Sequence, residues 1–186
     1  MICDLADAIH VTTMNRLQQA LVWIGRLPYC RGFGIQSPTD YRFVRYVINE
    51  HWPYYAYEQV GSGDGWLRRK TGRLCLRLAN ERQPAVVLDR VGLGDYLSAG
   101  CRKTQLTEQL QGIIELAVVP MNADAGALLA QCDERSVVVL TDIYRHKEQW
   151  RAVQRDERVV VTFDLYYCGI VLFDHRQSKN NYKVNF

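Results

Sequence analysis

The sequence predicts an α/β protein whose N-terminal helices pack on a mostly parallel sheet. Two observations predict this class. Residues 13–82 place apolar side chains at helical intervals, whereas the chain after Pro84 contains short, continuous apolar runs, which are typical of strands covered on both faces. Helical stretches separate several of these runs, and this alternation is typical of βαβ units. We therefore expect a helical segment, 1–83, packed on an α/β core, 84–186, in one compact domain.

Three helices are expected in the N-terminal segment. The first spans 13–27 and is amphipathic, because three apolar residues recur at intervals of three and four: Leu17, Leu21 and Ile24. The second is expected at 39–51, directly after Pro38. The third, 66–82, carries the densest basic cluster of the chain: Arg68, Arg69, Lys70 and Arg73. Basic residues at helical spacing usually form a solvated face, and we expect one here.

Five apolar runs are the predicted strands of the core: 85–88, 113–119, 136–140, 158–163 and 170–173. Helices are predicted between them at 123–132 and 146–155. Only the stretch from Asp164 to Gly169 separates the last two runs, so they are expected to pair as an antiparallel hairpin. The sheet is therefore predicted to hold about five or six strands and to include a C-terminal β-hairpin.

The composition is that of a globular domain. The hydrophobic fraction is 48% and the charged fraction 23%, which is enough apolar material for a core and argues against a disordered chain. The net charge is only +3 and the isoelectric point about 8.5, below the strongly basic balance of most nucleic-acid binders. Nucleic acid is therefore the least favoured partner.

The same sequence features predict a soluble cytoplasmic protein. The six cysteines form no Cys-x-x-Cys pair, and the histidines do not lie at zinc-ligand spacing around them, so we expect reduced thiols and no metal. No basic region precedes an apolar run at the N-terminus, and no apolar run reaches membrane-spanning length.

The loop after the first predicted strand is the best place for a ligand in such a sheet. This strand ends in Asp89, and Gly92 and Gly94 follow it closely. In an open α/β sheet ligands bind at the carboxyl ends of strands, and glycines let the backbone approach a cofactor. Two glycines at this spacing also occur in plain structural turns, so both interpretations stay open.

Several stretches together resemble a group of bacterial class I SAM-dependent methyltransferase-like proteins. Residues 32–38, Gly-Phe-Gly-Ile-Gln-Ser-Pro, resemble the Gly-x-Gly-Ile-x-Ser-Pro signature before their first conserved helix, and 54–58 resemble the aromatic segment after it. Near the C-terminus, 137–143 is similar to a strand that typically ends in Asp-Asp-Ile, and 182–186 is similar to the closing segment. The resemblance implies a Rossmann-like methyltransferase sheet and a site for SAM at the loop after the first strand.

Departures from the family pattern lie where this cofactor site is implied. Asp89 stands in for the acid of the cofactor motif, but Val91 occupies the place of its first glycine, and a β-branched residue disfavours the backbone that a glycine adopts. The interval between Val91 and Ser136 is too short for the three strand–helix units of the standard fold. We therefore expect a sheet truncated on one side, and Glu108 is the only candidate for the acid that contacts the ribose.

Further residues are candidates for the site. Asp142, at the end of a predicted strand, joins Asp89, Gly92 and Gly94 as a candidate SAM-binding residue. His146, four positions later, is a candidate base, although a histidine at a helix start is the commoner interpretation. Three tyrosines are candidates for stacking on a substrate or for aromatic packing between the helices and the core: Tyr54, Tyr55 and Tyr57.

Two hypotheses for function follow. The favoured one is a degenerate, non-catalytic methyltransferase homologue that acts through a protein partner or a homodimer, because a truncated sheet exposes an edge that needs cover. The alternative is a working SAM-dependent methyltransferase with a non-standard loop built from Asp89, Gly92, Gly94 and Asp142, in which positioning of a nucleophile does most of the catalysis.

Overall fold

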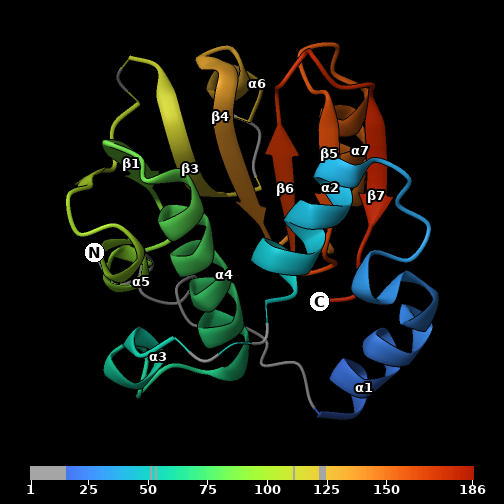
Figure 1. The fold of residues 1–186 in the computed structure, drawn as a ribbon, viewed down its shortest axis with the longest axis horizontal. Coiled ribbons are helices and arrows are strands. Elements are labelled where there is room, and N and C mark those ends of the chain that lie inside the picture. The colour runs from blue at the N-terminus through green and yellow to red at the C-terminus, as the bar shows by residue number, and fades with distance from the viewer. Residues whose placement is uncertain (1–15, 51, 53, 111, 122–124) are drawn as a thin grey trace, which may run out of the picture.

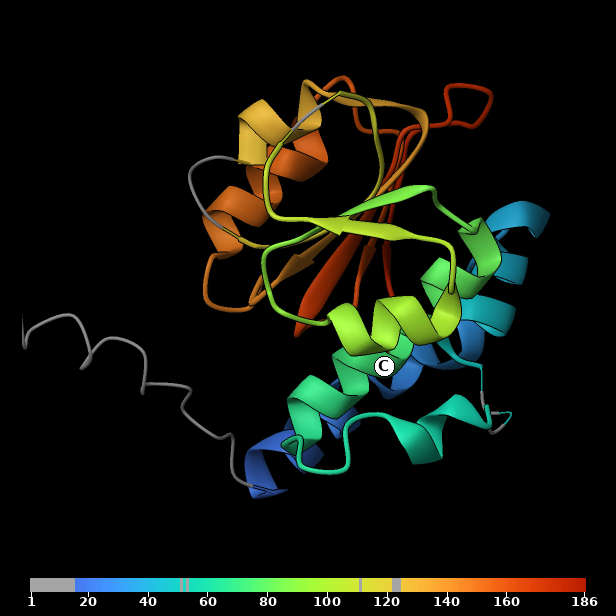
Figure 2. The same cartoon turned by 90° about the vertical axis from the view of Figure 1, so that its left-hand side faces the viewer.

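The chain folds as three layers, with a mixed sheet between two layers of helices. The computed structural model describes residues 16–50, 52, 54–110, 112–121 and 125–186. The sheet has seven strands in the order β2-β1-β3-β4-β6-β5-β7, and Figure 2 shows it nearly edge-on between the helices. The strands are β1 (Val86–Asp89), β2 (Gln105–Thr107), β3 (Ile114–Pro120), β4 (Cys132–Thr141), β5 (Val161–Asp164), β6 (Cys168–Leu172) and β7 (Asn180–Lys183).

The helices precede and alternate with these strands (Figure 1). They are α1 (Arg16–Gly25), η2 (Leu27–Gly32), α2 (Pro38–Phe43), η3 (Val44–Ile48), α3 (Ala56–Gln59), α4 (Trp66–Arg82), α5 (Gly94–Gly100), α6 (Ala125–Leu129) and α7 (Lys147–Arg155). None of the helices in the described part of the chain combines the length and the apolar character that a bilayer crossing requires.

Most predicted elements are confirmed. Helix α4 has the predicted bounds, α2 and η3 together form the helix expected at 39–51, and α1 lies within 13–27. Residues 13–15 and His51, the ends of two of these predictions, lie outside the described residues. The five apolar runs become β1, β3, β4, β5 and β6, and α6 and α7 lie in the helical stretches between them. Of the helix predicted at 123–132, residues 123 and 124 lie outside the described residues, α6 ends at Leu129, and Cys132 already begins β4.

The predicted number of strands, five or six, is wrong. Two further strands extend the sheet at its two edges, β2 beside β1 and β7 beside β5. Neither contains a continuous apolar run, because an edge strand buries little of its surface. The predicted hairpin is confirmed: β5 and β6 pair antiparallel, from Val161 with Leu172 to Asp164 with Gly169. Strands β2, β1, β3 and β4 are all parallel.

Side chains of the central strands point alternately into two hydrophobic clusters. In β4, Val137 and Val139 face the side covered by η3, α4 and α5, whereas Val138 and Leu140 face α6 and α7. All four are fully buried. This two-sided burial explains the continuous apolar runs of the sequence, since a strand covered on both faces has no polar side to alternate with.

The glycine-containing signature at 32–38 shapes the entry into the second helix. Gly32 and Gly34 both have positive φ, +78° and +84°, and turn the chain after η2. The side chain of Ser37 caps α2 by accepting a hydrogen bond from the N–H of Asp40 at 3.3 Å, and Pro38 fits the first helical turn. The signature therefore has a local folding role in this chain.

Helix α1 is the amphipathic helix that the sequence predicts, but its apolar side is not part of the core. It has no buried residue, and Leu21, Trp23 and Ile24 are between 52% and 60% exposed. The turn after α1 is fixed more firmly, because the guanidinium of Arg26 pairs with the carboxylate of Asp164 at 3.0 Å.

Candidate functional site

The loop after β1 is stabilised by the acid that ends the strand. Asp89 is 7% exposed, and its Oδ1 accepts hydrogen bonds from the N–H groups of Val91, at 3.0 Å, and Gly92, at 2.9 Å. Gly92 adopts φ +74°, a conformation that suits glycine. The structure thus brings Asp89 and Gly92 together, but it commits this carboxylate oxygen to the loop itself.

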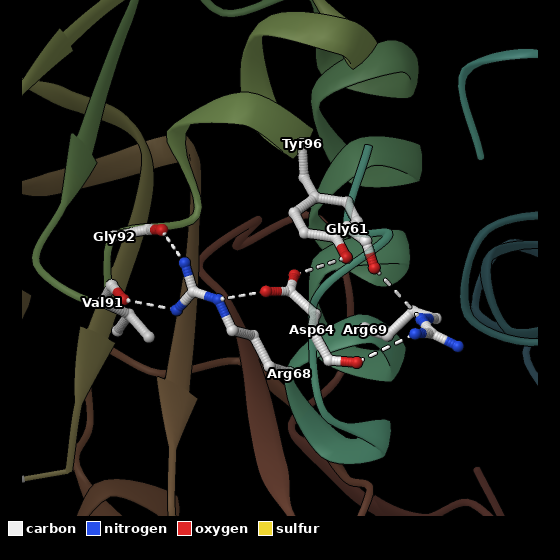
Figure 3. A network of polar contacts seen from close by, with 7 residues as sticks. All are labelled: Gly61, Asp64, Arg68, Arg69, Val91, Gly92 and Tyr96. Atoms are coloured by element: carbon white, nitrogen blue, oxygen red, sulfur yellow. Dashed lines mark hydrogen bonds and ion pairs between the residues drawn. The ribbon is translucent and has the colours of Figure 1, made fainter. Parts of the chain in front are cut away.

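Arg68, a residue of α4, is hydrogen-bonded to the same loop (Figure 3). Its guanidinium donates to the carbonyl oxygens of Val91, at 3.3 Å, and Gly92, and it pairs with the carboxylate of Asp64 at 3.1 Å. Asp64 also accepts a hydrogen bond from the hydroxyl of Tyr96 at 2.8 Å. Burial and this hydrogen bond raise the pKa of Tyr96 to about 12. Both the N–H and the carbonyl groups of Val91 and Gly92 therefore have protein partners.

Gly94 begins α5 and packs close to the edge strand. A Cβ built on it would lie 2.8 Å from a methyl group of Leu106 in β2, the end of a flexible side chain that is 44% exposed. A small side chain at this position would therefore require Leu106 to move. A cavity of about 590 Å³ beside the loop is lined by Gly92, Asp64 and Tyr96, and its lining includes neither Asp89 nor Gly94.

Glu108 lies beside Asp89 at the carboxyl edge of the sheet. Strand β2 pairs with β1 in parallel, with Leu88 opposite Thr107, so the next residues of the two strands are Asp89 and Glu108. The backbone carbonyl of Glu108 accepts a hydrogen bond from Arg90 at 3.0 Å. The sequence analysis named Glu108 as the only candidate for the acid that contacts the ribose. It did not predict β2, the short polar strand that ends just before Glu108 and places this residue beside Asp89.

Asp142 lies apart from the loop. It follows β4, and the register places Val139 of β4 level with Asp89, two strands away. Asp142 is three residues further along, so the two acids are separated by about 10 Å across the sheet and about 10 Å along it. Asp142 adopts φ +60°, and its N–H donates to the carbonyl of Tyr167 at 2.8 Å. The structure therefore does not gather Asp89 and Asp142 into one compact cluster.

The three candidate tyrosines differ in their surroundings. The Tyr54 and Tyr57 rings contact each other, with centroids 5.3 Å apart, and both pack against the core. The hydroxyl of Tyr57 accepts a hydrogen bond from buried Arg77 at 2.9 Å, and burial raises the pKa of Tyr54. Tyr55 is 93% exposed. This arrangement fits aromatic packing between the helices and the core, the other interpretation of these residues.

His146 occupies the N-cap position of α7. Its side chain makes no capping hydrogen bond, and its backbone N–H donates to the carbonyl of Ile143 at 3.1 Å. It therefore sits in the turn that follows Asp142, at a helix start.

The sequence did not point to an aromatic cluster at the carboxyl end of β4. The rings of Tyr144 and Tyr166 stack with centroids 5.4 Å apart, and Tyr167 meets both of them edge-on. The edge of Trp66, from the start of α4, also meets Tyr167, at 5.3 Å. The sequence did contain one indication of this cluster, because Tyr166 and Tyr167 are adjacent in the turn between β5 and β6. A turn at the edge of the sheet presents its side chains to the surface on which Tyr144 lies.

Within the described ranges no group of three or more His, Cys, Asp and Glu side chains is placed to hold a metal ion. Comparison of the chain with protein-family models, with curated proteins and with solved structures gives no match. The function is therefore argued from the geometry of the chain itself.

Proposed function

We propose that this chain is a methyltransferase-like protein that does not bind SAM and acts by associating with a second copy of itself. The observation that carries this proposal is the state of Asp89. Its side chain is 7% exposed, and one oxygen accepts two N–H groups of its own loop. An acid held in this way is a structural cap of the turn.

The carbonyl side of the loop supports the same proposal. SAM carries a positively charged ammonium and a sulfonium, so a loop that receives it needs free acceptors or a free carboxylate. Here the carbonyls of Val91 and Gly92 accept from Arg68. A cofactor that contacted these carbonyls would have to displace Arg68, and we derive no methyl-transfer step.

The exposed face of α1 supports self-association. Two large apolar side chains on the same side of this helix, one turn apart, are more than half exposed: Leu21 at 60% and Ile24 at 56%. An apolar surface of this kind on one helix is typical of a protein–protein contact. The edge strand β2 contributes less, because it has only three residues, and lysine and arginine precede it.

A second candidate function, a SAM-binding enzyme, is favoured by one observation. Asp89 and Glu108 end neighbouring parallel strands at the carboxyl edge of the sheet. Two carboxylates at this position suit a ligand with hydroxyl or ammonium groups. Arg68 would then have to release the loop when the ligand binds. Because its side chain is 46% exposed, this release would need little free energy.

Titration calorimetry with SAM and S-adenosylhomocysteine separates the two candidates. We expect no binding to the wild type or to Arg68→Ala, because the Asp89 cap persists without Arg68. Binding to Arg68→Ala alone would make Arg68 the only obstacle and would refute the argument from Asp89.

Light scattering tests the self-association. We expect the wild type to have a dimeric mass, and Leu21→Glu combined with Ile24→Glu to give a monomer with an unchanged far-ultraviolet circular dichroism spectrum. Matched exposed substitutions on α7, Lys147→Glu and Gln149→Glu, should leave the dimer intact. A monomeric wild type would contradict this part of the proposal.

A further inference from the structure

A cavity of about 470 Å³ lies on the flank of α4 that faces α1 and the C-terminal segment. Figure 1 shows the C-terminus between α4 and α1. The N–H of Asn185 donates to the carbonyl of Tyr29, and its side-chain amide donates to the carbonyl of Trp23, both at about 3 Å. These bonds hold the C-terminal segment against α1 and η2, and they complete the walls of the cavity.

The basic cluster of α4 lines this cavity, contrary to the expectation of a solvated face. Its lining includes positions 66, 69, 70, 73 and 77 of α4, which lie on one side of a helix. Arg68 alone of the predicted cluster turns to the other flank, toward the loop after β1. Arg69, Lys70 and Arg73 are half-buried. The expectation failed because it took no account of the C-terminal segment, which covers this side of the helix.

The cavity carries a strong excess of positive charge. Arg31 from η2 joins the four basic residues of α4, and among the described residues of the lining Glu50 supplies the single carboxylate side chain. None of these five cations takes part in an ion pair within the described residues. Arg31 is held at φ +55°, in the left-handed region that costs a residue with a Cβ about 1 kcal/mol or more.

Two of the five cations already have neutral hydrogen-bond partners. Arg77 donates to the carbonyls of Val47, at 2.6 Å, and Ile48, at 2.8 Å, and Arg69 donates to the carbonyl of Asp64 at 2.9 Å. Neutral acceptors satisfy the N–H groups, but they leave the positive charge in place. Arg69 and Arg77 therefore contribute a fixed positive potential to the cavity.

Lys70 and Arg73, one helical turn apart, lack partners of comparable strength. The ammonium of Lys70 lies 5.2 Å from the centre of the Trp66 ring and 4.5 Å from that of Phe186. The Arg73 guanidinium lies 4.6 Å from the Tyr57 ring, and its buried Nε has no hydrogen-bond partner in the described part of the chain. Burial lowers the pKa of Lys70 to about 8. Charges placed in this way are stabilised by an anion.

We propose that this cavity binds a small phosphate monoester that carries a planar aromatic group, such as a nucleoside monophosphate. A dianionic phosphate matches the excess of positive charge in the lining, and Lys70 and Arg73 are the residues that would contact it. Trp23, Trp66 and Phe186 line the same cavity and supply aromatic surface for the planar group. The volume lies within the range of small-molecule sites.

This site is separate from the loop after β1, and the inference does not rest on the proposed function. SAM has no phosphate, and the two sites lie on opposite flanks of α4, so Glu108→Gln tests one and the double variant Lys70→Met with Arg73→Gln tests the other. A failure of one proposal therefore leaves the other intact.

Titration calorimetry of the full chain with AMP, GMP, CMP and UMP tests the site, with adenosine and inorganic phosphate as partial ligands. We expect at least one nucleotide to bind more tightly than either partial ligand. The double variant Lys70→Met with Arg73→Gln should weaken that binding at least about tenfold, because both charge-assisted contacts are lost. The control variant Arg102→Gln with Lys103→Met removes the same charge from an exposed turn and should bind as the wild type does.

Two results would overturn the inference. One is the absence of binding of all four nucleotides at millimolar concentration. The other is undiminished binding to the double variant, whose folded state is checked by circular dichroism. Trp23→Ala gives an independent readout: it should weaken nucleotide binding and leave the affinity for inorganic phosphate unchanged, because Trp23 lines the cavity without a cation–π contact to Lys70 or Arg73.

Discussion

Replacing Lys70 with methionine should make the ligand-free protein more stable at neutral pH. Methionine keeps the length of the apolar stem and removes a charge that burial disfavours. The pKa of Lys70 falls from 10.5 to about 8, which corresponds to about 3 kcal/mol at about 1.4 kcal/mol per pH unit. Cation–π attraction to the rings of Trp66 and Phe186 offsets about 1 kcal/mol of this destabilisation. We therefore expect a gain of about 2 kcal/mol in the free energy of unfolding at pH 7.

The gain should depend on pH with a definite sign. The folded pKa of Lys70 is lower than the unfolded one, so between about pH 8 and 10.5 the unfolded chain binds more protons, and the wild type becomes more stable as the pH rises. The destabilisation of the wild type by the charged Lys70 is fully present below pH 8 and disappears above pH 10.5. Buried thiols such as Cys168, whose pKa burial raises to about 12, oppose this trend, but they are present in both proteins and largely cancel in the difference.

Urea unfolding followed by tryptophan fluorescence measures this difference, in buffers without phosphate so that the cavity has no anionic ligand. The advantage of Lys70→Met should be largest at pH 7 and should shrink by pH 10. A variant that is less stable than the wild type at pH 7, or an advantage that does not change with pH, would refute the claim that Lys70 is a desolvated cation.

Three further substitutions, one of them with a matched control, test the fold. Gly100→Ala should lower the free energy of unfolding in urea by about 3 kcal/mol, because its Cβ would collide with the backbone carbonyl of Leu76. The control Gly126→Ala, at a helical position with open space around it, should be neutral or stabilising. Asp89→Ala should cost about 2 kcal/mol because two N–H groups lose their charged acceptor in partly buried hydrogen bonds; an unchanged unfolding midpoint would show that the cap is dispensable. Arg26→Ala should lower the stability by about 2 kcal/mol, because its ion pair with Asp164 is largely buried; a loss below 0.5 kcal/mol, about the level of an exposed pair, would contradict this.

The sequence predicted the elements whose signal is local. Helix α4 was predicted with its observed bounds because apolar residues recur along it and glycines precede it. Strands β3 and β4 were predicted because burial on both faces leaves a continuous apolar run. Strands β2 and β7 were missed because an edge strand is recognised by its partner, and neither has an apolar run of its own.

The candidate site was predicted only in part, because its chemistry depends on distant contacts. The sequence placed Asp89 and Gly92 in one loop, but an acid before glycines fits both a ligand contact and a turn cap, and the hydrogen bonds of Asp89 show the cap. The cavity at Lys70 was missed for a related reason. Helical spacing predicts which side chains share a face, but the residue that covers this face, Phe186, is more than a hundred positions away.

Titration of the wild-type protein with SAM is the most direct test of the central claim, that the loop after β1 is closed by its own residues. The account predicts no heat of binding up to millimolar SAM, in wild type and Arg68→Ala alike, while a nucleoside monophosphate binds in the cavity at Lys70. Micromolar binding of SAM to the wild type, lost in Glu108→Gln, would contradict it and identify the chain as a SAM-binding protein with Asp89 and Glu108 in its site.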